Sequence, residues 1–404
     1  MRHFITALIL SLVPIAARAQ MPPALPAEAL VEVVDPAKVN YLKAHVVVSG
    51  PVTGPFTLRL PNAVYRARLF LVGESHGSAA PQALDLQLLT ELNRRVGLRD
   101  YLAEIDPVQA ERFNRYLTTG DEADLDRVFA HWDHAAQWGN TLFKDKVRKV
   151  RALNQALPAG KRIRFWGIDA IQYWPLLIDW LTAAGAAPDA KALEAAPTEK
   201  AKADLALTWL AASNGGDPIT RAALRVGLTQ RAAGNRESTI FAGYEHLVTS
   251  GALGDRPAYG LWGVFHVLQA SVNGNAPFAT RVRQSKLPAA QSMVGIALVL
   301  LDSTVLIPAP TPEGVKMMRM TQFNTDGPMI KMDGSADLRA ATTPYSLTVF
   351  NLAAPGSPYA SGPDFARVQT TVGQNFVPDD PKAPATAYLG MIGVVRGSDW
   401  APPL

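Results

Sequence analysis

Short, continuously apolar runs alternate with longer amphipathic stretches along most of this chain, and this alternation restricts its possible folds more than any other feature. Runs without polar interruption are typical of strands that are covered on both faces of a sheet. Amphipathic helices are expected over residues 81–97 and 142–160, and strands over residues 67–73, 100–105, 162–168, 259–265 and 293–301. The pattern predicts an α/β fold in which a mainly parallel central sheet is flanked by helices.

One long region breaks the alternation. Residues 182–250 are rich in alanine and contain no credible strand, which indicates a helical insertion or subdomain. This insertion would either cover part of a functional site or simply pack on the sheet. Residues 304–384 are rich in proline, glycine and threonine, and late strands are expected over residues 347–352 and 387–395.

The first nineteen residues have the features of a secretory signal. Arg2 precedes an apolar run over residues 4–17, and Ala17-Arg18-Ala19 forms a small-x-small cleavage site. We expect cleavage after Ala19 and a periplasmic or secreted protein. Residues 20–66 would then form an N-terminal extension before an α/β domain over residues 67–404. No later run has the length and apolar character of a membrane span.

Composition excludes several kinds of chemistry. The chain has no cysteine, which excludes disulfide bonds, thiolate metal sites and cysteine nucleophiles. Its formal charge of +4 comes from scattered lysine and arginine residues, with the densest group at residues 144–151. On a helix these positions spread around the axis, which is typical of a solvated surface. No nucleic-acid partner is therefore expected.

Ionisable side chains lie at or just beyond the carboxyl ends of the first five predicted strands. They are Glu74 and His76, Glu104 and Asp106, Asp169, His266, and Asp302. Ligands of open parallel sheets bind beyond the carboxyl ends of the strands, so each of these residues is a candidate for the functional site. Asp106 and Asp302 also suit a helix cap or a solvated loop. Glu104 lies inside an apolar run, where a buried carboxylate needs a partner or a proton.

Residues 73–77, Gly-Glu-Ser-His-Gly, admit two interpretations. They fit the G-x-S-x-G turn of serine hydrolases, in which Ser75 would be the nucleophile and Asp169 and His266 would complete the order of a triad. They also fit a glutamate and a histidine whose side chains project to the same side of an extended strand. We favour the second interpretation, because only about fifty residues of the processed chain precede Ser75 and no HGGG-like segment is among them.

Several segments, taken in order, resemble the erythromycin esterase-like proteins. "VGESHG" at residues 72–77 and "LRDYLAEID" at residues 98–106 are similar to the opening of that family. "RIRFWGIDA", "NRESTIFAGYEHL" and "YGLWGVFHV", at residues 162–170, 235–247 and 259–267, resemble its later motifs. The resemblance covers most of the chain from Leu71 onward, and it implies a hydrolase that cleaves a small-molecule ester or lactone without an obligatory cofactor.

The resemblance also implies a role for each matching residue. His76 matches the family's general base, which activates a water molecule, and Glu74 and Glu104 match acidic residues that would orient the imidazole and raise its basicity. His266 would bind or polarise the substrate carbonyl, sharing this task with Arg236.

Other readings of these later residues stay open at this point. Asp169 would orient its neighbours rather than react. Arg236 and Glu237 form either part of the site or an ion pair at the start of a helix. His266 is either functional or a satisfied buried histidine beside Trp262.

Two further functions are alternatives to an esterase. Only Ser75 separates the glutamate and histidine of the first motif, whereas the family usually has two residues there. The shorter spacing resembles the haem-uptake ChaN branch of the broader superfamily, which also contains metal-dependent Tiki-type proteases. A metal-dependent hydrolase would bind Zn, Mn or Co through Glu74, His76, Glu104 and His266. A haem-binding protein would use Tyr244, Tyr259 or a histidine as the axial ligand.

Overall fold

The computed structural model describes residues 23–54, 56, 58, 60–133 and 136–404, so the expected signal peptide lies outside the described residues. The described part is built on an eight-stranded sheet with the order β1-β10-β12-β6-β2-β5-β3-β4. Its strands are β1 (Val46–Pro51), β2 (Leu69–Glu74), β3 (Asp100–Ala103), β4 (Arg164–Gly167), β5 (Ala258–Gly263), β6 (Met293–Leu301), β10 (Ser346–Asn351) and β12 (Met391–Arg396). All neighbouring pairs from β12 to β4 are parallel, and β10 is antiparallel to both of its neighbours. The predicted α/β fold with a mainly parallel sheet is confirmed.

Strand β2 shows why its sequence is apolar without interruption. Successive side chains of a strand point to opposite faces of the sheet. Leu69 and Leu71 belong to the hydrophobic core on one face, and Phe70 and Val72 belong to the core on the other. Both faces of β2 are therefore buried, and no position along it is available for a solvated polar residue.

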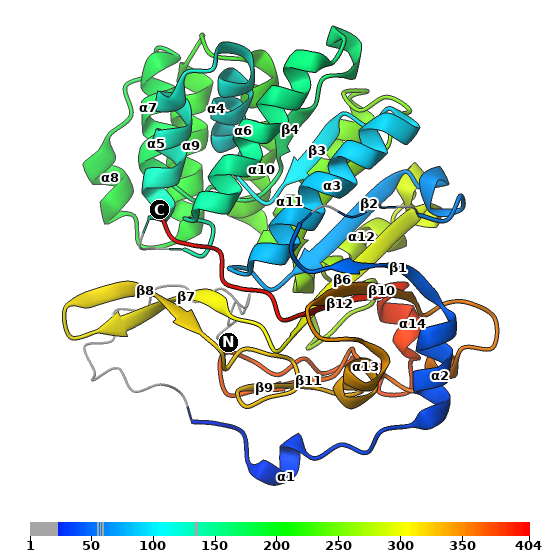
Figure 1. The fold of residues 1–404 in the computed structure, drawn as a ribbon. Helices are drawn as coiled ribbons and strands as arrows, with labels where there is room; N and C mark the ends of the chain where they lie inside the picture. Colours follow the sequence, from blue (N-terminus) through cyan, green and yellow to red (C-terminus); the bar gives the residue numbers. More distant parts are fainter. Residues whose placement is uncertain (1–22, 55, 57, 59, 134–135) are drawn as a thin grey trace.

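Helices cover the sheet on both faces (Figure 1). One core includes residues of α3 (Ala79–Val96), α4 (Pro107–Thr119), α5 (Glu122–Trp132), α6 (Thr141–Ala156) and α7 (Trp174–Ala183). The other includes residues of α2 (Pro36–Ala44), α12 (Phe278–Gln284), α13 (Ser335–Ala341) and α14 (Ala385–Tyr388). As predicted, α3 ends at Gly97, which adopts a left-handed conformation with φ of 67°.

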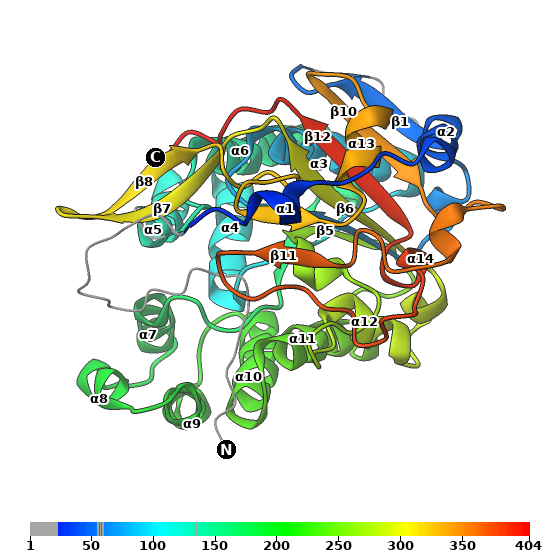
Figure 2. The same ribbon diagram turned by 90° about the horizontal axis from the view of Figure 1, so that it is seen from below.

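Residues 182–250 contain α8 (Ala190–Ala195), α9 (Glu199–Ala212), α10 (Pro218–Ala233) and α11 (Arg236–Thr249). The helices α7, α8 and α9 lie together at the end of the molecule that is remote from β1 and β10 (Figures 1 and 2). α9 and α10 pack into the first core, whereas α11 packs into the second. This segment thus reaches both faces of the sheet, and its last helix begins beside the ends of β3 and β4.

The C-terminal third adds a hairpin and a small two-stranded sheet. The hairpin consists of β7 (Val305–Thr311) and β8 (Gly314–Met320), and β9 (Ile330–Met332) pairs with β11 (Val368–Thr370). The expected strand over residues 387–395 starts too early, because α14 continues to Tyr388 and β12 begins at Met391. Packing of Tyr388 into the second core decides this, and apolar character alone does not distinguish a buried helical turn from a strand.

The N-terminal extension contributes to the main sheet, although the sequence predicts no strand there. β1 pairs with β10 in antiparallel orientation and buries Val48 against the first core. Farther upstream, Glu32 accepts hydrogen bonds from the amides of Gly334 and Ala336, which ties the extension to the start of α13. Within the described part of the chain, no helix combines the length and the apolar character needed to cross a membrane.

Candidate active site

The carboxyl ends of four parallel strands bring the predicted site residues together. Glu74 is the last residue of β2, Glu104 follows β3, Asp169 follows β4, and His266 lies in a short turn after β5. Because β5 lies between β2 and β3 in the sheet, these strand ends are neighbours although they are far apart in the sequence. The site thus lies where open parallel sheets bind their ligands.

Glu104 is the centre of the site. Its Oε1 accepts a hydrogen bond from Arg236 Nη2 at 2.7 Å and lies 3.2 Å from His266 Nε2. Its Oε2 accepts from the Gly263 amide at 2.7 Å and lies 3.7 Å from His76 Nε2. Burial would raise the pKa of Glu104, but the charges of His266, His76 and Arg236 outweigh burial and hold the pKa well below its usual range. Glu104 is therefore a buried carboxylate surrounded by cationic partners.

His76 makes the contacts expected of an oriented base. Its Nδ1 lies 3.1 Å from Glu74 Oε1, and its side chain is 14% exposed. The ring packs on Trp138, with 4.5 Å between the ring centres. Burial lowers the pKa of His76, but Glu104 and Glu74 more than offset this effect and raise the pKa above its ordinary value. If Nδ1 carries the proton donated to Glu74, Nε2 is the basic nitrogen.

Gly263 lets the two histidines approach each other. A Cβ atom at this position would lie 3.0 Å from His76 Nε2 and 3.6 Å from His266 Cδ2. Any side chain there would crowd the nitrogen that is free to act as a base. Gly263 also donates its amide to Glu104, so its backbone is part of the site. A glycine within an apolar strand is a weak signal in a single sequence, so the sequence alone does not mark Gly263 as a site residue.

Arg236 is fixed by two carboxylates. It is the first residue of α11, and its Nε and Nη2 donate to the two oxygens of Asp169 at 2.9 Å and 2.5 Å. Its Nη2 also donates to Glu104, and its Nη1 lies 3.3 Å from His266 Nε2. Burial would lower the pKa of Arg236, but Asp169 and Glu104 outweigh it and raise the pKa. This paired geometry is typical of a guanidinium held in one orientation.

His266 is held by Glu237, the second residue of α11. Its Nδ1 lies 2.9 Å from Glu237 Oε1, and Glu237 Oε2 accepts from the Phe278 amide at the start of α12. Burial lowers the pKa of His266, but Glu237 and Glu104 outweigh it and raise the pKa to about 10. The raised pKa favours the imidazolium form of His266 at neutral pH. Trp262 does lie against its ring, at 5.7 Å between ring centres.

A buried polar network behind the site was not found from the sequence. Gln82 donates to both oxygens of Glu74, at 3.1 Å and 3.3 Å, and accepts from Lys146 Nζ at 2.7 Å. Lys146 in turn donates to Asp85, which also accepts from the hydroxyl of Tyr259. Polar residues on the buried faces of amphipathic helices are the signal that identifies such a network.

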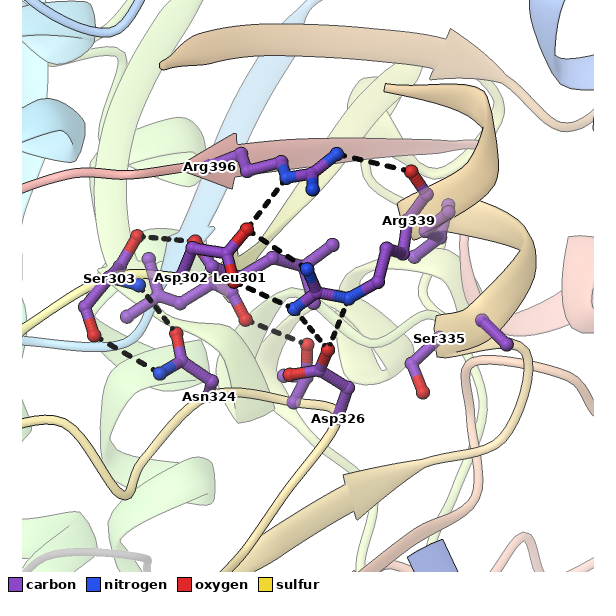
Figure 3. Close-up of polar contacts among 12 residues, drawn as sticks. Leu301, Asp302, Ser303, Asn324, Asp326, Ser335, Arg339 and Arg396 are labelled. Carbon is purple, nitrogen blue, oxygen red and sulfur yellow. Dashed lines mark hydrogen bonds and ion pairs between the residues drawn. The ribbon is translucent and has the colours of Figure 1, made fainter. Parts of the chain in front are cut away.

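Two of the strand-end residues lie outside the site. Asp106 caps α4, where its side chain accepts from the amides of Val108 and Gln109. Asp302 binds Arg339 and Arg396 in a separate network (Figure 3). Register explains the second case, because Ala297 of β6 is opposite Gly73 and Asp302 is five residues farther along the strand direction. That spacing corresponds to about 16 Å.

The structure does not give Ser75 the surroundings of a nucleophile. Ser75 is partly exposed, and its φ is not among the positive values of the described chain. The ring nitrogens of His76 and His266 face carboxylates and Arg236 rather than Ser75. Helix α3 starts at Ala79, after a further turn. Among the residues that the structure describes, no histidine therefore forms a hydrogen bond with Ser75, as the elbow interpretation would require.

The arrangement of these residues does not suit a bound metal or haem. In the described part of the chain, no group of three or more histidine and acidic side chains has a metal-binding arrangement. The Arg236 guanidinium contacts Glu104 and His266, which places a fixed cation among the would-be ligands. Tyr259 is fully buried and donates to Asp85, and Tyr244 is buried against Phe278. The geometry fits neither a dinuclear or mononuclear metal centre nor axial ligation by either tyrosine.

Comparison with known proteins identifies the fold. No protein-family model and no curated protein matches this sequence. Among solved structures, a Bacillus cereus protein is similar over 91% of this chain and 98% of its own, with a TM-score of 0.61 and 13% identity. A protein described as a succinoglycan biosynthesis protein is similar over 91% of this chain and 98% of its own, with a TM-score of 0.59 and 12% identity.

A mutant of the erythromycin esterase EreC in its open conformation is also similar. It covers 85% of this chain and 93% of its own, with a TM-score of 0.54 and 15% identity. The fold resemblance predicted from the ordered motifs is confirmed: the chain has the erythromycin esterase-like fold. At these identities, the likeness establishes the architecture and leaves the reaction to be argued from the site.

Proposed function

We propose that this protein is an exported hydrolase that cleaves a carboxylic ester or lactone by general-base activation of water. The observation that carries this proposal is the pair of contacts made by the His76 ring. Its Nδ1 is bound to Glu74, and its Nε2 lies beside Glu104 in a partly exposed side chain. A histidine that one carboxylate orients, and whose other nitrogen lies 3.7 Å from Glu104 Oε2 without a hydrogen bond to it, is suited to accept a proton. The erythromycin esterase among the structural neighbours supports an ester or lactone as the substrate class.

In this mechanism, His76 Nε2 takes a proton from water as the water oxygen bonds to the carbonyl carbon. The carbonyl π electrons move to its oxygen and form a tetrahedral oxyanion. Collapse of this intermediate breaks the bond to the alkoxide leaving group, which receives the proton from His76. The products are a carboxylic acid and an alcohol, or a single hydroxy acid from a lactone. No serine or metal takes part in these steps.

Arg236 is the best donor for the oxyanion. Its Nε and Nη2 are used by Asp169 and Glu104, whereas Nη1 contacts His266 Nε2 only. Nη1 carries two protons and contacts a single group among the described residues, so at least one proton is available to a substrate oxygen. A fixed cation there stabilises developing negative charge.

Hydrolysis of a panel of aryl esters, alkyl esters and macrolactones tests the proposal. We expect turnover of at least one member, measured by pH-stat and mass spectrometry, and we expect it to survive dialysis against EDTA. Loss of turnover with EDTA and its return with Zn, Mn or Co would replace the proposal by the metal-dependent alternative. Absence of turnover together with a Soret band on adding haem would replace it by the binding-protein alternative.

The pH dependence of kcat/KM provides a more specific prediction. His76 acts as a base only when it is neutral, and its pKa lies above the ordinary value of 6.5. Activity should therefore rise with pH through an apparent pKa higher than 6.5. Replacing Glu74 with glutamine removes one of the charges that raise this pKa, so the rising limb should shift to lower pH. A limb that stays in place in that variant would contradict the assignment of His76 as the base.

A further inference from the structure

A basic cavity lies at the opposite end of β4 from the candidate active site. Its volume is about 390 Å³, and it is formed at the outer edge of β4, between α4 and α6. Three of its lining residues are Arg151, Arg162 and Arg164, and no acidic side chain is among the described residues that line it. Arg164 begins β4 and Asp169 lies five residues later, which corresponds to about 16 Å. The cavity is therefore separate from the Glu104 cluster.

Arg164 is partly buried without a counter-charge. Within the described chain its guanidinium makes no ion pair, and its Nε is buried with no hydrogen-bond partner. It packs over the Trp166 ring, with 4.2 Å between the guanidinium carbon and the ring centre. Burial lowers the pKa of Arg164, and the nearby acids offset this only partly. Each of those acids accepts a hydrogen bond from another group: Asp100 from Arg256, Asp217 from the Thr220 amide at the start of α10, and Glu111 from Trp180.

Arg151, on α6, is likewise a partly buried arginine without an acidic partner in the described chain. Its Nε is also buried without a partner, and it makes no ion pair with any residue that the structure describes. With the Gln155 amide turned so that its oxygen faces the guanidinium, Gln155 accepts from Arg151 Nη1 at 2.7 Å. By contrast, the buried Arg236 contacts two carboxylates. A guanidinium withdrawn from water without an acid is unfavourable, and an anion in the cavity would offset this cost.

The walls of the cavity are fixed by the edge strand itself. Asn114 bonds both the carbonyl and the amide of Phe165, and Asn154 does the same with Ile163. These two amides complete the hydrogen bonding of β4 and are not available to a ligand. The donors that remain free come from the arginines, whose planar forks match oxyanions.

The cavity is larger than a single small ion needs. Its volume lies within the range of small-molecule sites. A second cavity of about 310 Å³ is lined by Arg162 and Arg164 as well, together with Arg99 and the ion pair of Arg256 with Asp100. The two cavities therefore share Arg162 and Arg164.

We propose that this arginine-lined cavity is a binding site for a small phosphorylated anion, such as a phosphate monoester or a diphosphate. Arg164 and Arg151 are the principal ligands, and Trp166 and the two asparagines position Arg164 and the strand that carries it. This binding site does not depend on ester hydrolysis, so it can be tested whether or not the proposed function is correct.

Isothermal titration calorimetry with inorganic phosphate and with pyrophosphate, at ionic strength held constant with sodium chloride, tests the proposal. We expect saturable binding by the wild-type protein, tighter for pyrophosphate. Arg164→Met and Arg151→Met should each weaken it by roughly tenfold or more, because each removes a charge-assisted bond. The matched control is Arg225→Met, which removes the same charge from an exposed position of α10 outside the cavity and should bind like wild type.

The controls separate a binding defect from misfolding. Arg164→Met should be no less stable than wild type in phosphate-free buffer, because it removes a buried charge that lacks a counter-ion. If Arg164→Met does not fold, Arg164→Lys keeps the charge and loses the fork, and it should still bind pyrophosphate less tightly. No saturable binding by wild type, equal binding by the Arg164 and Arg225 variants, or binding of citrate but not of pyrophosphate would each overturn the proposal.

Discussion

Replacing His76 with alanine is expected to lower kcat/KM for ester hydrolysis by about 10²–10⁴-fold, whereas replacing Ser75 with alanine should leave it nearly unchanged. The reason is geometric. His76 is oriented by Glu74 at 3.1 Å and lies beside Glu104, so its loss removes the base. Ser75 adjoins this pair in sequence, but neither histidine of the site directs a nitrogen to it. Steady-state kinetics on the best ester of the panel would give both ratios.

This pair of substitutions separates the two interpretations of residues 73–77. His76→Gln serves as a second variant, since it keeps a polar side chain of similar size but cannot act as a base near neutral pH. Circular dichroism and thermal unfolding should show that all three variants remain folded. The opposite outcome would contradict the proposed mechanism: an active His76→Ala, together with an inactive Ser75→Ala that no longer forms an acyl-enzyme. Ser75 would then be the nucleophile.

The second large effect concerns stability. Replacing Glu104 with glutamine should lower the free energy of unfolding by about 3–5 kcal/mol, because it removes one partner from a buried set of charges. Arg236 and the His266 imidazolium would then share less negative charge, and the Gly263 amide would face an altered acceptor. The change keeps the shape of the side chain, so the loss reports charge rather than a cavity. Urea denaturation at neutral pH provides the measurement.

Asp302 is the matched control for this experiment. Asp302→Asn makes the same change of carboxylate to amide in a network with two arginines, Arg339 and Arg396 (Figure 3). Its side chain is 44% exposed, so its ion pairs are screened and the expected cost is within about 1 kcal/mol. Asparagine also tolerates the left-handed backbone of Asp302, whose φ is 50°. Equal losses in the two variants would show that Glu104 is not a special centre of buried charge.

Much of the site was accessible from the sequence because a parallel sheet gathers its strand ends. Glu74, Glu104, Asp169 and His266 could be selected as ionisable residues that follow apolar runs, and the structure places all four in one cluster. Arg236 and Glu237 came only from the motif resemblance, since nothing in a helical, alanine-rich segment marks a helix start as part of a site. Their catalytic roles stay predictions.

The partners behind these residues required the tertiary structure. Gln82, Lys146 and Asp85 lie on α3 and α6, and they meet because the two helices pack against the same face of the sheet. The Arg164 cavity likewise arises where α4 and α6 flank an edge strand. No local pattern specifies which helices become neighbours, because such contacts join residues that are distant along the chain.

The sequence by itself determined the class of fold, the approximate positions of five of the six parallel strands and the strand-end residues, because continuous burial leaves a local apolar signature. Tertiary structure alone decided which of those ends form one site. The order of the strands places β5 between β2 and β3 and so joins Glu74 to Glu104 and His266, while the longer β6 carries Asp302 away from them. Strand order and register depend on the packing of the whole sheet, and a single strand does not encode them.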